Sequence, residues 1–264
     1  MKIIMVLNLS GCDNEASTDN NNIISNSAMK SNLINNNGVY IFTKFFPNKD
    51  RETIILLHGG PGLPDDFQAV VDILKSNYQV ITFHQRGTKQ SPVKTRNYTM
   101  EAYLSDIEVI RKHYGIEKFH LWGHSWGGLY AQIYAEKYPE NLLSLFLCNP
   151  GSGTNNEWKQ TEKEVLQFNK SKCSNWEWTK MGMNSLWGML GSDTAYKKLY
   201  IQVKRNYNKD FIVNDNLEDN FDNVKAEAIN KSRPEIVKYP ILSKQSNPTY
   251  NKITIVYGDM DCSA

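Results

Sequence analysis

Residues 118–128 read Lys-Phe-His-Leu-Trp-Gly-His-Ser-Trp-Gly-Gly, and this stretch decides the fold. An apolar run of strand length comes first, a G-x-S-x-G motif follows at Gly123–Gly127, and a helical pattern begins at Leu129. In such a strand–turn–helix the serine lies on a tight, strained turn that presents its hydroxyl above the sheet. Small residues must flank the serine, because larger side chains would collide with the neighbouring strand or helix. The pattern therefore predicts Ser125 as a catalytic nucleophile.

The segments around this motif alternate between strand and helix patterns. The run Thr53–Leu57 is apolar almost throughout, as expected for a parallel strand that helices cover on both faces. Helical spacing follows at 65–76, and a helix capped by Thr99 precedes the strand before the serine. Further strand patterns lie at 39–46, 78–83, 142–148 and 253–257. This order predicts a mostly parallel, doubly wound α/β sheet whose first part spans residues 38–148.

A glycine-rich turn, His58-Gly59-Gly60-Pro61-Gly62, follows the strand at Thr53–Leu57. Glycines at this place let backbone N–H groups point at a developing oxyanion, and each such donor stabilises the transition state by roughly 3 kcal/mol. We assign the two donors to the N–H groups of Gly60 and of Trp126, the residue after the nucleophile. The alternative is an ordinary turn rich in glycine and proline.

Three motifs together resemble those of the proline iminopeptidase (prolyl aminopeptidase) branch of the α/β-hydrolases. They are His58–Gly62, Gln85-Arg-Gly87 with Ser91, and Gly123–Gly127. The resemblance covers roughly residues 39–261. It implies an α/β-hydrolase fold with an inserted helical cap, and a serine hydrolase that releases N-terminal proline or a similar residue from short peptides through an acyl-enzyme.

The chain departs from the family at two positions of the second motif. The family usually has Asp-Gln-Arg-Gly-x-Gly-x-Ser, whereas here His84 replaces the Asp and Lys89 replaces the second Gly. These two replacements bring the geometry of the loop into question. The assignment of the substrate by resemblance is in question for the same reason. A capped hydrolase acting on esters or lactones is the alternative enzyme, because an elbow and an oxyanion turn serve acyl transfer in general.

The resemblance also implies the acid of a catalytic triad. Gly258-Asp-Met-Asp261 matches the family's G-x-x-D, so Asp261 is the implied acid rather than Asp259; the alternative is that both acids only end the strand. In this fold the chain order is Ser, acid, His, and every histidine precedes Asp261. We therefore expect the chain as given to lack the catalytic histidine, together with the last strand, the last helix and the histidine loop of the family. We also expect it to be inactive. The histidines are His58, His84, His113, His120 and His124, of which His84 is the one alternative base.

Residues 149–247 interrupt the alternation with helical patterns, and we expect them to form a helical cap before the core resumes at 248–264. In the resembling aminopeptidases, cap glutamates bind the free amino group of the substrate, and Glu177, next to Trp176, could play that part. A solvated glutamate is the default for any one position. The competing candidates are Glu162, Glu164, Glu218, Glu227 and Glu235.

The N-terminus has the pattern of an export signal in residues 1–12. One lysine and a short apolar run precede Leu9-Ser-Gly-Cys12, which resembles the bacterial lipoprotein signal and implies a lipid anchor on Cys12. Residues 13–37 hold nine asparagines and predict a tether with too little apolar surface to fold. The alternative is an ordinary apolar N-terminus of a cytoplasmic protein.

Composition excludes several other classes. The 30 Lys and Arg against 28 Asp and Glu leave a formal charge of +2, which gives no reason to expect a nucleic acid partner. No disulfide framework is predicted from the other cysteines, which are Cys148, Cys173 and Cys262. No motif indicates a cofactor or a metal. The expected partner is a small peptide or ester, with a membrane reached only through Cys12. A catalytically inactive binding homologue is the alternative outside enzymes.

Overall fold

The computed structural model describes residues 28–151, 155–210, 221–236 and 252–256. Its centre is a sheet with the strand order β1-β2-β4-β3-β5-β6-β7. From β4 to β7 neighbouring strands are parallel, whereas β1 and β2 form an antiparallel hairpin on the side of β4. The strands are β1 (Lys30–Asn36), β2 (Val39–Phe46), β3 (Thr53–Leu57), β4 (Gln79–Phe83), β5 (Phe119–Ser125), β6 (Leu142–Pro150) and β7 (Ile253–Val256). The predicted mostly parallel α/β sheet is confirmed.

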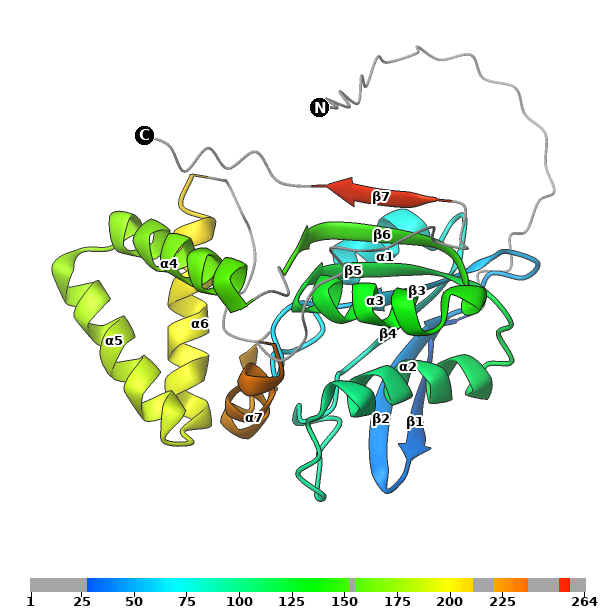
Figure 1. Cartoon of the computed structure of the whole chain (residues 1–264), viewed down its shortest axis with the longest axis horizontal. Coiled ribbons are helices and arrows are strands. Elements are labelled where there is room, and N and C mark those ends of the chain that lie inside the picture. Colours follow the sequence, from blue (N-terminus) through cyan, green and yellow to red (C-terminus); the bar gives the residue numbers. More distant parts are fainter. Residues whose placement is uncertain (1–27, 152–154, 211–220, 237–251, 257–264) are drawn as a thin grey trace, which may run out of the picture.

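Helices cover both faces of this sheet. Ile55 and Leu57 of β3 lie in one apolar cluster with residues of α2 (Met100–His113) and α3 (Trp126–Lys137). The alternate residues Ile54 and Leu56 lie in a second cluster with Val71 of α1 (Gln68–Leu74). In Figure 1, α2 and α3 lie in front of the sheet and α1 behind it. Because successive side chains of a strand point to opposite faces, all five residues of β3 are buried.

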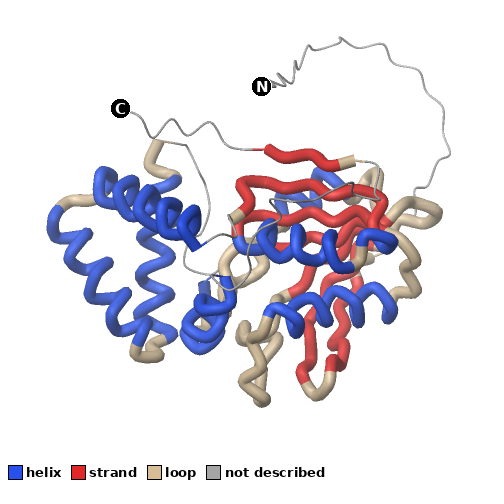
Figure 2. The backbone as a smooth tube through the Cα atoms, in the orientation of Figure 1, coloured by secondary structure: helices blue, strands red, loops and turns tan. Residues whose placement is uncertain are grey.

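The remaining helices gather beyond the carboxyl ends of the parallel strands. They are α4 (Asn155–Lys172), α5 (Asn175–Met189), α6 (Asp193–Tyr207) and α7 (Ala226–Ile236). Elsewhere, a short 3-10 turn, η1 (Pro139–Asn141), precedes β6. Figure 2 separates these helices from the strands, and α7 lies between the sheet and the other three. Strand β6 extends to Pro150, so the sheet takes the first two residues of the predicted cap range. Within the parts described, no helix is both long and apolar enough to cross a membrane.

The predicted tether is wrong for Lys30–Asn36, which form strand β1 instead. Ile34 is buried in the main apolar cluster, and the asparagines find partners in the fold. Asn32 donates from its side-chain amide to the Tyr114 hydroxyl at 3.0 Å, and Asn36 donates to Asp106 Oδ1 at 2.7 Å. Composition misses such a strand, because polar side chains with fixed partners do not need an apolar surface to be ordered. Residues 13–27 lie outside the described part.

Candidate active site

Ser125 is the last residue of β5 and the residue that precedes α3. Its backbone has φ 51° and ψ −118°, a left-handed conformation that a residue with a side chain rarely adopts. The Ser125 carbonyl accepts from the N–H of Gly151 at 2.7 Å, which ties the turn to the end of β6. Surrounding structure must hold such a conformation in place, and in an elbow of this kind it directs the serine hydroxyl away from the sheet.

Two glycines make this turn sterically possible. A Cβ added to Gly123 would lie 2.6 Å from the Gly127 carbonyl oxygen. A Cβ added to Gly127 would lie 2.1 Å from the carbonyl oxygen of Leu57 on the neighbouring strand. Both distances are far shorter than van der Waals contact, and both obstacles are backbone atoms that cannot rotate away. The G-x-S-x-G spacing is therefore a packing requirement of the strand–turn–helix.

The glycine-rich turn after β3 lies against the serine. A Cβ on Gly59 would come within 3.2 Å of Ser125 Cβ and 3.0 Å of His124 Nδ1. Gly60 has φ +65°, a conformation that favours glycine. Trp126 opens α3, where the first N–H groups have no partner within the helix and the helix dipole favours negative charge. The two predicted donors, Gly60 and Trp126, thus belong to the two segments that meet at Ser125.

Gln85 joins these two segments, and our sequence analysis gave it no individual role. Its side-chain Nε2 donates to the His58 carbonyl at 2.7 Å, and its Oε1 accepts from the Trp126 indole N–H at 2.9 Å. Gln85 is fully buried. A single amide group therefore connects the start of the glycine-rich turn to the helix that follows the nucleophile. The Gln-Arg-Gly motif drew attention to this residue, but only three-dimensional contacts reveal what it holds.

His58 is a neutral structural histidine. Its Nδ1 lies 2.9 Å from the Gly59 carbonyl oxygen, which can only accept, so Nδ1 carries the proton. The Gln85 backbone N–H then donates to Nε2 at 3.3 Å, which requires that nitrogen to be unprotonated. Burial lowers the pKa of the His58 imidazole, in agreement with both bonds. His58 therefore fixes the glycine-rich turn rather than accepting a proton from a substrate.

The other histidines differ in their surroundings. Burial lowers the pKa of His84 to about 4, and its ring Nδ1 has no hydrogen-bond partner in the described structure. His120 lies near the start of β5, between Ser144 Oγ at 2.8 Å and Glu52 Oε2 at 3.0 Å. Burial also lowers the pKa of His124, and His113 is exposed at the end of α2. Among the described residues, no hydrogen bond joins a histidine ring to the Ser125 hydroxyl.

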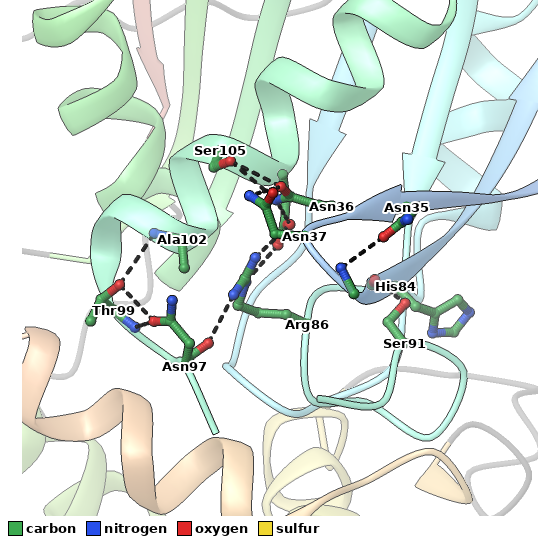
Figure 3. Close-up of polar contacts among 12 residues, drawn as sticks. Asn35, Asn36, Asn37, His84, Arg86, Ser91, Asn97, Thr99, Ala102 and Ser105 are labelled. Carbon is green, nitrogen blue, oxygen red and sulfur yellow. Dashed lines mark hydrogen bonds and ion pairs between the residues drawn. The ribbon is translucent and has the colours of Figure 1, made fainter. Parts of the chain in front are cut away.

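A buried ion pair holds the loop that carries Gln85. The Arg86 guanidinium donates to both carboxylate oxygens of Asp106 at 2.7 Å, and it also donates to the Asn97 carbonyl at 2.8 Å. Asn36 of β1 donates to the same carboxylate at 2.7 Å, and Figure 3 shows Arg86 between the β1 hairpin and Asn97. Burial raises the pKa of Asp106, and the bonds from Arg86 oppose this effect. The loop is thus attached to α2 and to β1 at once.

The same loop, residues 84–91, contains the two positions where the chain departs from the family pattern, and hydrogen bonds join its two ends. The Ser91 hydroxyl donates to the His84 carbonyl at 2.7 Å and accepts from the Phe42 N–H at 2.9 Å. Lys89 donates its backbone N–H to the Asn223 carbonyl at 3.2 Å. The His84 ring lies on Phe42, with 5.6 Å between ring centroids. The hydrogen bonds within the loop therefore form with His84 and Lys89 at these two positions. The Lys89 backbone N–H connects the loop to the segment before α7.

The structure places Glu177 in the first turn of α5, where it completes a capping box. Its carboxylate accepts from the Ser174 N–H at 2.8 Å, and the Ser174 hydroxyl in turn caps the Glu177 N–H. The Ser174 hydroxyl also donates to this carboxylate at 2.7 Å, and this bond, together with that from the Ser174 N–H, lowers the pKa of Glu177. Capping accounts for this residue, and binding of a substrate amine stays a prediction. Of the competing glutamates, Glu162 pairs with Arg233, Glu227 with Arg96, Glu164 accepts from Gln160, Glu235 accepts from the Met100 N–H, and Glu218 lies outside the described residues.

Two predicted residues and one rejected alternative lie outside the residues that the structure describes. Asp261 and Asp259 follow β7, and Cys12 lies in the N-terminal segment. Strand β7 is parallel to β6, with Leu145 opposite Ile253, so the chain leaves β7 at the edge where Ser125 lies. That direction is the one that an acid after this strand requires.

Comparison with known proteins gives a consistent assignment. A family profile described as "alpha/beta hydrolase fold" matches residues 52–172. Proline iminopeptidases from Lactobacillus helveticus and Lactobacillus delbrueckii subsp. bulgaricus are 36% and 38% identical to this chain over 125 and 126 residues. One from Clostridioides difficile is 29% identical over 121 residues. Each alignment covers 45% of this chain and 41% or 42% of the relative, so the match spans less than half the length of these relatives.

Solved structures agree on the fold. A probable hydrolytic enzyme from Pseudomonas aeruginosa PAO1 has a TM-score of 0.54 and 17% identity, with 87% of this chain and 73% of that chain covered. VinJ has a TM-score of 0.53 and 18% identity, with 69% and 60% covered. The sheet, the turn at Ser125 and the profile match over residues 52–172 give this chain the α/β-hydrolase fold, and its sequence is similar to those of proline iminopeptidases over 45% of its length.

Proposed function

We propose that this chain carries the nucleophile and the oxyanion turn of a serine hydrolase that releases N-terminal proline, or a similar residue, from short peptides. The observation that carries the proposal is the strained Ser125 turn, packed within 3.2 Å of the position a Gly59 Cβ would take. The similarity to proline iminopeptidases over 45% of the chain supports the choice of substrate class. The matched part is shorter than those relatives, so the activity is proposed for the whole protein.

The proposed reaction runs through an acyl-enzyme. Ser125 Oγ attacks the carbonyl carbon of the peptide bond while its proton passes to a general base, and the N–H groups of Gly60 and Trp126 bind the resulting oxyanion. The base returns the proton to the leaving amine, and water then hydrolyses the acyl ester. Asp261 orients the base. In the chain order of this fold the base is a histidine that follows the acid, and residues 262–264 hold no histidine.

The role of Ser125 can be tested without knowing the substrate. A fluorophosphonate probe phosphonylates activated serines with loss of fluoride, so we expect it to label Ser125 in a version that includes whatever coding sequence follows Ala264, and Ser125→Ala to abolish the labelling. A chromogenic proline amide and a short-chain ester, tested side by side, then separate a peptidase from an esterase. Rapid labelling of residues 1–264 alone would mean that a base exists within the chain, and His84→Gln would be the first variant to test. Absence of labelling in the extended version would favour an inactive binding homologue.

We also propose that Cys12 is acylated and that residues 1–11 are removed in the native host. The support is the Leu9-Ser-Gly-Cys12 sequence and its lysine-bearing apolar start. Intact-mass analysis of the native protein should then show a diacylated cysteine as the first residue. An unmodified Met1 terminus in a detergent-free fraction would contradict the anchor.

A further inference from the structure

Helix α5 carries a row of large apolar side chains that nothing in the described structure covers. Trp176, Met183, Trp187 and Leu190, which directly follows the helix, are each between 53% and 78% exposed. Isolated exposed apolar residues are common on protein surfaces, but several on one helix face mark a surface that contacts something. We call these four residues together with Lys180 the α5 stripe.

The spacing of the α5 stripe places it on a single face. Its members follow one another at intervals of four, three, four and three residues, from Trp176 through Lys180 to Leu190. Residues three and four apart are neighbours on a helix surface. A different face of α5 packs inward, because Met181 is buried and a Cβ on Gly188 would lie 2.3 Å from the Tyr196 ring of α6. The side chains of the α5 stripe therefore take no part in the packing of α5 against the neighbouring helices.

The part of the chain that carries the α5 stripe is basic overall, although Glu177 lies beside Trp176. Lys180 lies within the row, with its ammonium 5.0 Å from the centre of the Trp176 ring. No acidic residue occurs between Trp178 and Ser192. Residues 155–210, which include α4, α5 and α6, hold ten Lys or Arg against six Asp or Glu. An apolar row of tryptophan, methionine and leucine on a basic part of the molecule is complementary to an anionic lipid surface.

We propose that the α5 stripe rests on an anionic membrane surface, with α5 lying in the plane of the lipid headgroups. Tryptophan suits this position, because its ring is apolar and its N–H is polar. Lys180 distinguishes a membrane from a second copy of the chain. In a dry interface between two helices its ammonium would have to be desolvated, whereas at a bilayer the side chain extends to the phosphates while its methylenes stay apolar. The proposal does not depend on the catalytic activity or on acylation of Cys12.

Vesicle co-sedimentation tests the proposal on the full chain with Cys12→Ser, which removes any acyl anchor. We expect binding to vesicles of equal parts phosphatidylglycerol and phosphatidylethanolamine, and much weaker binding to pure phosphatidylcholine. Trp187→Ser should weaken the partition to the anionic vesicles by about tenfold or more, because one buried aromatic side chain is removed. Lys180→Glu should weaken it by about tenfold, with little change on phosphatidylcholine. Ile73→Ser is the matched control, because Ile73 is 73% exposed on α1, on the far face of the sheet.

Three results would overturn the proposal. The first is a parent chain that does not bind anionic vesicles at all. The second is a Trp187→Ser variant that binds as the parent does. The third is a parent chain that dimerises in size-exclusion chromatography with light scattering, is converted to a monomer by Trp187→Ser and ignores vesicles, which would assign the α5 stripe to self-association. Unchanged circular dichroism and thermal unfolding of each variant show that lost binding is not lost folding.

Discussion

The indole N–H of Trp126 donates to the side-chain oxygen of Gln85 at 2.9 Å, and through this bond the helix after the nucleophile is connected to the loop after β4. The same amide holds the His58 carbonyl at 2.7 Å. Gln85 thus fixes the distance between the two segments that carry the proposed oxyanion donors. A loop that is remote in sequence from both motifs determines how they face each other.

Replacing Gln85 by leucine should therefore destabilise the protein strongly. The variant removes two hydrogen bonds and leaves the His58 carbonyl and the Trp126 N–H buried without a partner, each at a cost of about 1–3 kcal/mol. We expect the free energy of unfolding in urea to fall by about 2–6 kcal/mol in total. Gln79→Leu is the control, because the Gln79 amide bonds to the Arg51 carbonyl at an exposed position. Equal effects of the two variants would contradict the role of Gln85.

Gly127→Ala should disrupt the turn at the nucleophile. The new methyl group would lie 2.1 Å from the Leu57 carbonyl oxygen, so either β3 or α3 must move. We expect a loss of about 3 kcal/mol or more, as for an overpacked core, measured by thermal or urea unfolding. Gly182→Ala makes the same chemical change within α5 at a position with nothing within 4 Å, and should raise stability by about 0.5–1 kcal/mol. A Gly127→Ala variant as stable as the parent would show that the backbone can adapt.

Stability should decrease in acid in a way that depends on His84. Its pKa is lowered to about 4 in the folded protein, whereas an unfolded histidine titrates near 6.5. Between these values the unfolded chain binds a proton that the folded protein does not, so stability is lost as pH falls from about 6.5 to about 4, by at most about 3 kcal/mol for this group.

Unfolding curves at a series of pH values can isolate this contribution. His84→Phe, which keeps a ring beside Phe42, should have a flatter profile than the parent between pH 6.5 and 4. His113→Gln changes an exposed histidine and should follow the parent profile. A His84→Phe profile parallel to that of the parent would mean that His84 is not held neutral.

Arg86→Met should be among the most damaging single changes in the chain. It leaves the Asp106 carboxylate buried without its cation, and breaking a buried pair in this way costs about 3–5 kcal/mol. Lys75→Met breaks the exposed pair with Asp72 and should change stability by about 0.5 kcal/mol or less. Denaturant titrations of both variants give the comparison, and similar values for the two would argue against a structural role of the buried pair.

Local patterns predicted the parts of the fold that local physics determines. Thr53–Leu57 is strand β3 with the bounds expected, because a strand covered on both faces must be apolar along its length. The Thr99 hydroxyl caps α2 by accepting from the Ala102 N–H at 3.3 Å, as predicted. The turn at Ser125 follows from the size of its neighbours. These features depend on residues close in sequence.

Long-range contacts determined what the patterns missed. Helix α1 begins only at Gln68; the Asp65 Oδ2 atom accepts from Thr82 and Lys44 of the sheet, while Oδ1 accepts from the Phe67 N–H just before the helix. The role of Gln85 depends on partners 27 and 41 positions away. Neither arrangement leaves a periodic signal in the sequence. The acid Asp261 lies outside the described residues, so its placement stays a prediction.

Because strand β1 begins at Lys30, the folded part of the chain begins no later than this residue. A product trimmed to begin at Val39 would lose not only an outer strand but also the Asn36 amide that contacts the Asp106 carboxylate at 2.7 Å. The edge of β2 would then be open to pairing with another chain. A protease that cut upstream of Lys30 would therefore leave the sheet whole, whereas a cut within Lys30–Asn36 would remove part of its outer strand.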